Sequence, residues 1–443
     1  MANPPDSLRN RTISGPILLL VGDLALRTAS GLVVGSAVLR HLGPTAAGQL
    51  AAALALTTVL RAVSGFGFDA VLPQSIAIAS PSEIRGLLNS AFSIRLLALL
   101  VVLPVQIGFV WKSQGDRSQT ISFLLVSIGV FGGPLEVGWW YLLGRGQASG
   151  AVPWRIGTTA LFALSRVFAL LTERGVEVFA AIAGIELIVP ELVLVVCARR
   201  NGLRVGRKRT YKKGPPVAGF TREFFRKSWP FSLGGLCFIF VQRFDLLVVH
   251  QLLGPFQAGR YSAVQRLAEG PFLLCSVVVV IAGPAIASKH SANASLHQAS
   301  YVGLIRILAL AAVGLGLLLS LLAPTLVRVV LGPKFHGVGG TFIIYLWSIV
   351  PVYLAAATSR LLIDIGKQNR ILVNGVAAAF LSVVLSLPLV RWLGIQGAAW
   401  ANTISYSVSM LVIPLIDPRQ HAVARILART VKRTQARNQS EFR

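Results

Sequence analysis

Apolar blocks long enough to cross a lipid bilayer recur along nearly the whole chain and constrain its fold more than any other feature. Leu, Val, Ala and Ile dominate these blocks. About 20 such residues in a helix span a hydrocarbon core of roughly 30 Å. The 443 residues are 54% hydrophobic and only 13% charged, whereas ordinary soluble domains are about 25% charged. The sequence therefore excludes a soluble enzyme and predicts an all-α integral membrane protein.

Clusters of Gly, Pro and charged residues divide the apolar blocks into twelve predicted transmembrane helices. The predicted spans are 15–39, 45–68, 86–111, 119–143, 152–172, 176–198, 228–252, 258–284, 301–331, 340–363, 371–391 and 395–416. The first block follows a polar segment and lacks a small-residue cleavage site. We therefore expect it to be retained as the first helix.

The Lys and Arg residues between the spans predict the orientation of the chain. With the N-terminus inside, one side of the membrane carries 26 of these cations, Arg155 among them, and the other side carries 7. Eleven of the 26 lie in the loop 199–227, and seven lie beyond residue 417. We expect both termini and this loop to be cytoplasmic, and an even number of spans agrees with that topology.

The net charge of +26 would also suit a nucleic-acid-binding protein, so the location of the cations decides between partners. They flank the apolar blocks, where each Lys or Arg near anionic lipid contributes about 1 kcal/mol. Anionic membrane lipids are therefore the expected partners, and nucleic acid is not. The cysteines Cys197, Cys237 and Cys275 and the six histidines show no metal-ligand spacing, so we predict neither a disulfide framework nor a metal site.

An internal duplication is visible at an offset of 211 residues. The segments 42–48 and 253–259 both read LGPxxAG, and Ala52 and Pro73 match Ala263 and Pro284 without a gap. We interpret the motif as a tight turn at which two helices approach closely, rather than as a substrate site. The chain is predicted to form an N-terminal six-helix bundle (1–198), a basic linker (199–227), a C-terminal six-helix bundle (228–416) and a basic tail (417–443). Six crossings per bundle make the repeats parallel, with a central cavity between them.

Catalytic motifs are missing: the sequence contains no GxSxG, HExxH, P-loop or dinucleotide-binding GxGxxG pattern, so neither catalytic residues nor a cofactor are predicted. Ionisable residues within the spans stand out instead, because each is costly in hydrocarbon and is expected to face protein or a water-filled cavity. The embedded cations are all arginines, namely Arg27, Arg61, Arg95, Arg166, Arg243, Arg260, Arg266, Arg306 and Arg360. The embedded acids are Asp23, Asp69, Glu136, Glu186, Glu191, Asp245, Glu269 and Asp364.

Two interpretations of these arginines stay open. Asp23 and Arg27, Arg360 and Asp364, and Arg266 and Glu269 are spaced to pair along one helix face. Arg95, Arg260 and Arg306 lie near enough to span ends to extend to the membrane surface. Arg61 and Arg166, however, have no acid nearby in the sequence. A cationic cavity, suited to an anionic substrate, is the second interpretation.

Four segments carry a family resemblance. They are RHLGPTAAGQLAAALAL (40–56), FDLLVVHQLLGPFQAGRYSAVQRLAEGP (244–271) with Pro284, APTLVRVVLGPKF (323–335) and LGIQGAAWA (393–401). In these the chain resembles the polysaccharide transport family, the O-antigen and exopolysaccharide repeat-unit flippases of the multidrug/oligosaccharidyl-lipid/polysaccharide exporter superfamily.

The resemblance implies two six-helix bundles that move a polyprenyl-pyrophosphate-linked glycan from the cytoplasmic to the outer leaflet of a bacterial cytoplasmic membrane. It also implies coupling to a proton or sodium gradient, and polysaccharide assembly proteins as further partners. The segments between the motifs contain no signature of the sugar.

On this basis we expect five arginines to line the cavity and bind the pyrophosphate, namely Arg27, Arg61, Arg243, Arg266 and Arg360. Four acids, Asp23, Asp245, Glu269 and Asp364, are candidates for ion coupling or charge pairing.

The sequence leaves two alternative functions open. An ion-coupled drug/cation antiporter of the same superfamily would need an acid-dominated cavity, and the embedded residues here are nine Arg against eight Asp and Glu. A membrane glycan polymerase or ligase would need a large extracytoplasmic loop, which the predicted topology lacks, and would not explain the duplication.

Overall fold

The computed structural model describes residues 14–65, 67–112, 117–203, 217–287, 294–367 and 369–417. Every regular element in these ranges is helical. The elements are α1 (Ser14–Gly65), α2 (Phe68–Ile78), α3 (Pro81–Lys112), α4 (Arg117–Ser127), η2 (Ile128–Glu136), α5 (Val137–Gly144), α6 (Ala148–Leu171), α7 (Val176–Glu186), α8 (Val189–Arg200), α9 (Val217–Ala287), α10 (Ala294–Leu326), η3 (Val327–Leu331), η4 (Pro333–Phe335), α11 (Gly339–Leu346), α12 (Ile349–Asp364), α13 (Asn369–Leu393), α14 (Ile395–Ser407), η5 (Val408–Val412) and α15 (Ile413–Ile416).

Within the described residues, ten helical segments are long and apolar enough to cross a membrane. This confirms a multi-pass, all-helical membrane protein. Two of the segments, Gly22–Gly65 and Leu233–Phe272, contain 44 and 40 residues. A straight helix of either length would extend to about 60 Å or more at 1.5 Å per residue, about twice the thickness of a hydrocarbon core. The central parts of the predicted linker (204–216) and nearly all of the predicted tail (418–443) lie outside the described residues.

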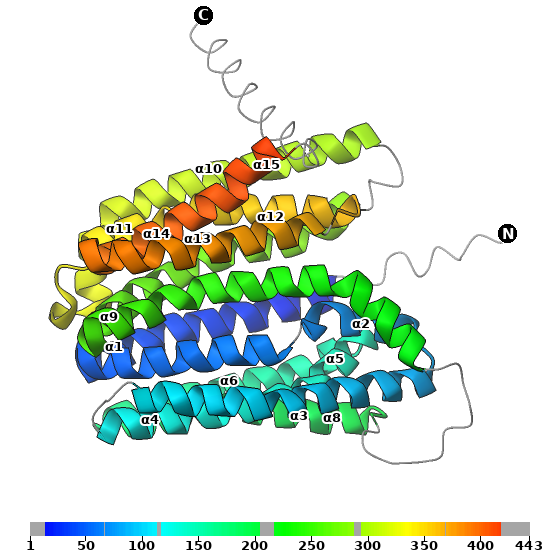
Figure 1. Ribbon diagram of the computed structural model, residues 1–443, viewed down its shortest axis with the longest axis horizontal. Helices are drawn as coiled ribbons and strands as arrows, with labels where there is room; N and C mark the ends of the chain where they lie inside the picture. The colour runs from blue at the N-terminus through cyan, green and yellow to red at the C-terminus, as the bar shows by residue number, and fades with distance from the viewer. Residues whose placement is uncertain are drawn as a thin grey trace, which may run out of the picture.

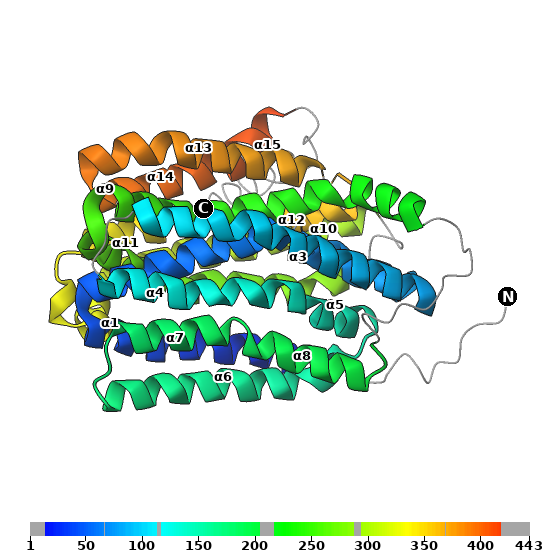
Figure 2. The same cartoon turned by 60° about the horizontal axis from the view of Figure 1, so that its bottom comes forward.

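Each of these two long segments turns back on itself at a glycine. Gly43 in α1 has φ 74° and ψ 173°, and Gly254 in α9 has φ 82° and ψ 176°. A positive φ of this kind favours glycine because other residues have a β-carbon that clashes. In Figures 1 and 2 both hairpins turn at the same end of the molecule, the left-hand end. We call it the glycine-turn end.

The two LGPxxAG motifs pack against each other at this end. A β-carbon added to Gly48 would lie 1.9 Å from the carbonyl oxygen of Pro255, and one added to Gly259 would lie 1.7 Å from that of Pro44. The contact is therefore reciprocal, and it brings α1 and α9 together backbone to backbone. This geometry agrees with the interpretation of the motif as a turn for close helix approach.

α1 joins the two halves of the molecule, which we define as α1–α8 and α9–α15. One buried apolar cluster packs Leu39, Ala47 and Ala55 of α1 against residues of α9, α11 and α14. A second cluster packs other faces of α1 against α3, α4 and α7. Large apolar side chains on α3 and α6 are exposed, as expected for surfaces that face lipid.

Four of the membrane helices are interrupted. α4 and α5 are separated by the 3₁₀ segment η2, and α7 and α8 by a break at residues 187–188. In the second half, α11 and α12 are separated at residues 347–348, and α14 and α15 by the π-helical η5. An interruption inside the membrane leaves backbone N–H and C=O groups without their helical hydrogen bonds. Other groups of the protein must then supply those hydrogen bonds.

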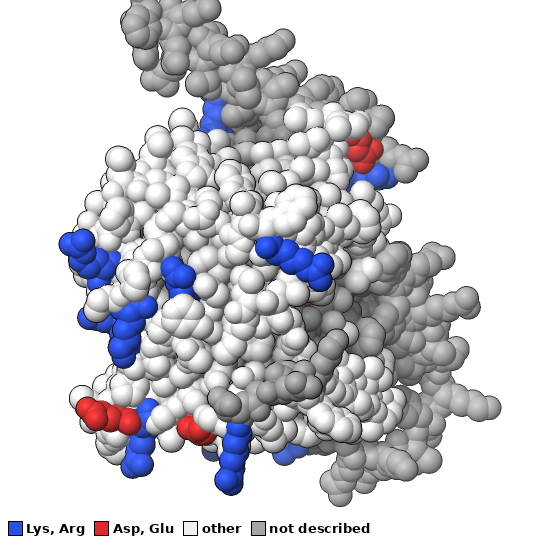
Figure 3. Space-filling model, turned by 60° about the vertical axis from the view of Figure 1, so that its left-hand side comes forward, with Lys and Arg blue, Asp and Glu red and all other residues white. Residues whose placement is uncertain are grey.

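Figure 3 looks at the glycine-turn end. Its surface is mostly uncharged, with separate Lys and Arg side chains and a few acids rather than a continuous basic patch. The sparse charge agrees with the small number of cations counted on that side of the predicted topology.

Candidate functional site

A cavity of about 620 Å³ opens between the two halves. Its walls come from α1 and α5–α8 on one side and from α9 on the other. The charged residues among its lining are six arginines and three glutamates, namely Arg27, Arg61, Arg155, Arg166, Arg243, Arg266, Glu186, Glu191 and Glu269. Among the described residues that line it, positive charge is therefore in excess.

Helix periodicity brings these side chains to the cavity. Arg155, Thr159, Phe162 and Arg166 of α6 all line it, and their spacing of four, three and four residues follows one face of an α-helix. The second limb of α1 places Leu54, Thr58 and Arg61 in the lining by the same rule.

On the wall formed by α1 and α6, two arginines share one carboxylate. Asp23 is 4% exposed, and its two oxygens lie 3.2 Å from Arg27 Nε and 3.3 Å from Arg155 Nη2. The Arg155 guanidinium also stacks on the ring of Trp139, 4.0 Å from its centroid. We call Arg27 and Arg155 the N-terminal arginine pair. Together with the single carboxylate of Asp23, the pair has one positive charge in excess.

The opposite wall repeats this arrangement. Glu269 Oε2 lies 3.0 Å from Arg266 Nη1, and its Oε1 lies 3.8 Å from Arg243 Nη2. Arg266 extends across to α1, where a β-carbon added to Gly35 would lie 3.2 Å from its guanidinium carbon. We call Arg243 and Arg266 the C-terminal arginine pair. Arg266 of this pair contacts the opposite half at Gly31 and Gly35, where α1 has no side chains.

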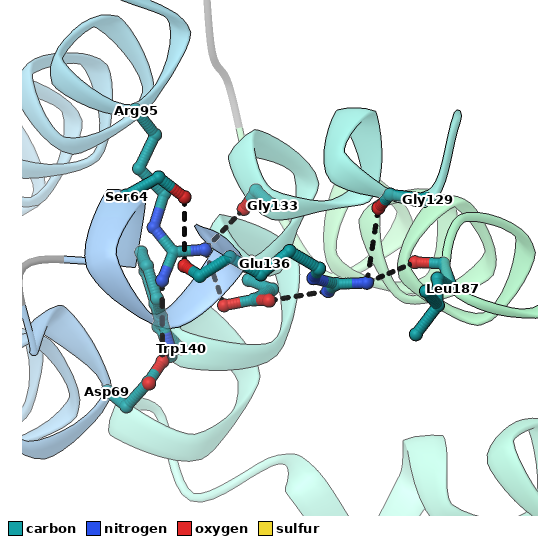
Figure 4. A network of polar contacts seen from close by, with 9 residues as sticks. Ser64, Asp69, Arg95, Gly129, Gly133, Glu136, Trp140 and Leu187 are labelled. Atoms are coloured by element: carbon teal, nitrogen blue, oxygen red, sulfur yellow. Dashed lines mark hydrogen bonds and ion pairs between the residues drawn. The ribbon is translucent and has the colours of Figure 1, made fainter. Parts of the chain in front are cut away.

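Figure 4 shows a polar network around Glu136 that also contains Arg95, Gly133 and Leu187. Arg61 belongs to this network. Its Nη2 donates to Glu136 Oε1 at 2.6 Å, and its Nη1 donates to the carbonyl of Leu187 at 2.7 Å. The other oxygen of Glu136 accepts from Arg95 Nη1 at 2.5 Å. Arg95 also donates to the Gly133 carbonyl at 2.6 Å. The network satisfies backbone groups that the breaks at η2 and between α7 and α8 leave free.

The last arginine of the cavity, Arg166, pairs with Glu186. Glu191, by contrast, forms no hydrogen bond or ion pair with any described residue, and its buried Oε2 is without a partner.

The sequence comparison identifies the family. A family model described as "Polysaccharide biosynthesis protein" matches residues 25–290, which is more than half of the chain. The chain belongs to this polysaccharide biosynthesis protein family. The family resemblance predicted from its motifs is confirmed, while no curated protein matches the chain by sequence.

Solved structures resemble this polysaccharide biosynthesis family member in fold. An inward-facing MATE family multidrug transporter of the MOP superfamily matches with a TM-score of 0.69 and 17% identity, over 93% of this chain and 98% of that chain. The lipid II flippase MurJ in an inward closed conformation matches with a TM-score of 0.67 and 13% identity, over 94% and 90%. An outward-facing MATE transporter has a TM-score of 0.60 and 16% identity, over 93% and 96%. At these identities the likeness concerns the fold.

The structure places four of the five predicted cavity arginines, Arg27, Arg61, Arg243 and Arg266, in the lining. Arg360 lies elsewhere in this family member. Its Nε is 3.4 Å from Asp364 Oδ1 on the next turn of α12, and Asp364 accepts a hydrogen bond from Tyr301 of α10. Arg360 is not among the residues that line this cavity, so the structure does not place it with the other four.

The four predicted acids have different surroundings. Asp23, Glu269 and Asp364 each pair with arginine. Asp245 is fully buried and has no described cation within ion-pair distance. Its carboxylate accepts from Tyr261 Oη at 2.5 Å, Gln265 Nε2 at 3.1 Å, Asn402 Nδ2 at 3.2 Å and its neighbouring Leu246 amide at 2.7 Å.

Two expectations, about Arg95 and Arg155, are corrected, and the lack of a nearby acid in the sequence at Arg61 and Arg166 is explained. Arg95 does not extend to the membrane surface, because it is 1% exposed and bound to Glu136. Arg61 and Arg166 do have acidic partners, but these are 75 and 20 residues away in sequence. Arg155, counted among the loop cations, lines the cavity; its spacing of eleven residues from Arg166, three helical turns, was the signal that could have identified it.

Proposed function

We propose that this protein is a flippase that moves a lipid-pyrophosphate-linked oligosaccharide from the cytoplasmic to the outer leaflet for surface polysaccharide assembly. The observation that carries the proposal is the double arginine pair in the cavity, in which Arg27 and Arg155 share Asp23 while Arg243 and Arg266 share Glu269. Each pair has one positive charge in excess, and each phosphoryl group of a pyrophosphate carries negative charge. The planar donor fork of arginine suits phosphate oxygens.

Transfer of such a headgroup across hydrocarbon would remove the water from its phosphates and hydroxyls at a high free-energy cost. A polar cavity between two halves replaces part of that water. The polyprenyl chain can remain in the lipid while the headgroup passes through the cavity.

The helix arrangement supports twelve crossings in two parallel repeats. Dividing the two long segments at Gly43 and Gly254 turns ten candidate spans into twelve. The interrupted helices then fall at the fourth and sixth positions of each half, and interruptions at corresponding positions of two repeats are typical of transporter binding sites. With the cation distribution, this favours an inner-membrane protein whose termini are both cytoplasmic.

Ion-gradient coupling is part of the proposal. Asp245 is the strongest candidate among the four acids, because it is the one whose described partners are all neutral. A proton or a sodium ion at this carboxylate would change the balance of charge in α9, which also holds Arg243 and Arg266. Polysaccharide assembly proteins are the proposed partners on the membrane surfaces.

The drug/cation antiporter remains the alternative, since MATE transporters share the fold. The excess of arginine over glutamate in the cavity lining disfavours it, because a cationic substrate would be repelled.

Substitution of Arg27 or Arg266 by Gln tests the proposal. Each charge-assisted contact contributes about 1.5–3 kcal/mol, so transport of the lipid-linked oligosaccharide into the outer leaflet should fall by about one to two powers of ten. Lys retains the charge without the fork and should give a smaller defect. Arg391→Gln is the matched control, because Arg391 is exposed at the glycine-turn end. Unchanged export at normal membrane abundance in both cavity variants would contradict the proposal.

A further inference from the structure

Glu191 is the cavity residue that the proposed function leaves unexplained. It lies in the first turn of α8, which begins inside the membrane after the break at residues 187–188. It lines the cavity, and it makes no hydrogen bond or ion pair within the described part of the chain. A largely buried carboxylate oxygen without a donor is costly in a membrane protein and calls for an explanation.

The neighbouring cations cannot supply that donor in this arrangement. Arg61, Arg155 and Arg27 are close enough to act on the charge of Glu191, yet each is bound elsewhere. Arg61 is held by Glu136 and the Leu187 carbonyl. Arg155 is fixed between Asp23 and the Trp139 ring, and Arg27 is bonded to Asp23.

The helix position of Glu191 contributes to stabilising negative charge on its carboxylate. It lies at the N-terminal end of a 12-residue helix, where the backbone dipole stabilises negative charge. On its wall the other acids are matched with arginine, Glu186 with Arg166 and Asp23 with two arginines. Glu191 is thus a residue of the cavity lining with an unused acceptor, and it lies near Arg27 and Arg155 of the proposed pyrophosphate site.

We propose that Glu191 accepts hydrogen bonds from the sugar attached to the pyrophosphate, an inference that rests on the proposed function. The groups that fit are donors, either hydroxyls or an ammonium or amide nitrogen. A sugar with a carboxylate at this place would be repelled by Glu191. The cavity therefore selects lipid-linked glycans whose first sugar is neutral or amino-bearing and excludes those in which it is a uronic acid.

Three probes test this with the full-length protein in lipid nanodiscs: undecaprenyl pyrophosphate, the same lipid bearing one glucose, and the same lipid bearing one glucuronic acid. The wild type should bind the glucose probe about tenfold or more tightly than the glucuronate probe. Glu191→Gln should weaken binding of the glucose probe by about tenfold, remove the discrimination, and leave undecaprenyl pyrophosphate unaffected. Glu191→Asp should retain part of the discrimination.

Arg266→Gln separates this inference from the function on which it rests, because it should weaken binding of all three probes. Equal binding of every probe by Glu191→Gln and the wild type would show that the carboxylate is only a protonated or structural group, and would overturn the inference alone. Failure of the wild type to bind any probe would overturn the proposed function, and this inference with it. Retained binding of undecaprenyl pyrophosphate by Glu191→Gln also verifies that the variant is folded.

Discussion

At the scale of single residues, the arginines divide into two groups by what they bind. Arg61 and Arg95 use their donors on one shared carboxylate and on backbone carbonyls of interrupted helices. Within the described part of the chain, Arg27 and Arg266 bind only carboxylates that they share with a second arginine, and both line the cavity. We therefore expect the first group to stabilise the fold and the second to be available to a ligand.

Arg61→Ala is therefore expected to act mainly on stability. It leaves Glu136 and the Leu187 carbonyl short of donors inside the membrane, and removal of one partner of a buried pair costs about 3–5 kcal/mol. The melting temperature of the detergent-solubilised protein and its membrane abundance should both fall. Arg27→Gln is the comparison, since it should lower transport while leaving the melting temperature nearly unchanged. Equal stability of Arg61→Ala and the wild type would contradict the structural role.

At the scale of elements, the hairpins of α1 and α9 contact each other at the glycine-turn end, and we expect this contact to close the cavity there. Gly48 and Gly259 allow direct backbone contact between the halves. Arg40 adds a bond from α1 to the carbonyl of Val329, at 3.2 Å. Movement of the two halves must separate these contacts if the cavity is to open at this end.

Gly48→Ala should loosen this closed end. Its new β-carbon would overlap the Pro255 carbonyl, and overpacking of this kind costs about 1–3 kcal/mol. We expect a cysteine at Ala47, a buried residue of the cavity wall, to react faster with a membrane-impermeant maleimide in the Gly48→Ala background. Gly108→Ala is the control, because nothing lies within 4 Å of its added β-carbon. An unchanged labelling rate would indicate that α1 and α9 do not form this closure.

At the scale of the whole molecule, the two ends are expected to face different compartments. The hairpin turns and the α13–α14 turn lie at one end, and the turn between α5 and α6 lies at the other (Figure 1). The cation distribution predicts that the glycine-turn end faces the outside.

Cysteine labelling in intact cells checks this topology. Gln396 and Gln147 are both exposed and uncharged, and they lie at opposite ends. Gln396→Cys should react with an impermeant maleimide in intact cells, whereas Gln147→Cys should react only after permeabilisation. The parent protein with its three cysteines provides the background. The reverse pattern would show that the chain is inserted the other way.

Much of the fold could be predicted from the sequence because membrane helices satisfy their own backbone and need only a sufficient length of apolar residues. The apolar blocks, the turns at Gly43 and Gly254, and the close approach of the LGPxxAG motifs all follow from local composition. The family followed from motifs of the same kind. Helix-face pairs such as Asp23 with Arg27 and Arg266 with Glu269 were also predictable, since i,i+3 and i,i+4 spacing is a local property.

Only the tertiary structure decided which charged residues meet and which are left without a partner. Arg61 and Glu136 are 75 residues apart in the sequence. Arg155 of α6 pairs with Asp23 of α1. No local spacing encodes either pair. Glu191, which follows the break between α7 and α8, is among the residues that line the cavity, and Arg360 is not. The sequence by itself determined a helical membrane protein of this family. Packing determined which residues form its candidate site, because the charge balance of a cavity depends on contacts between helices distant in the chain.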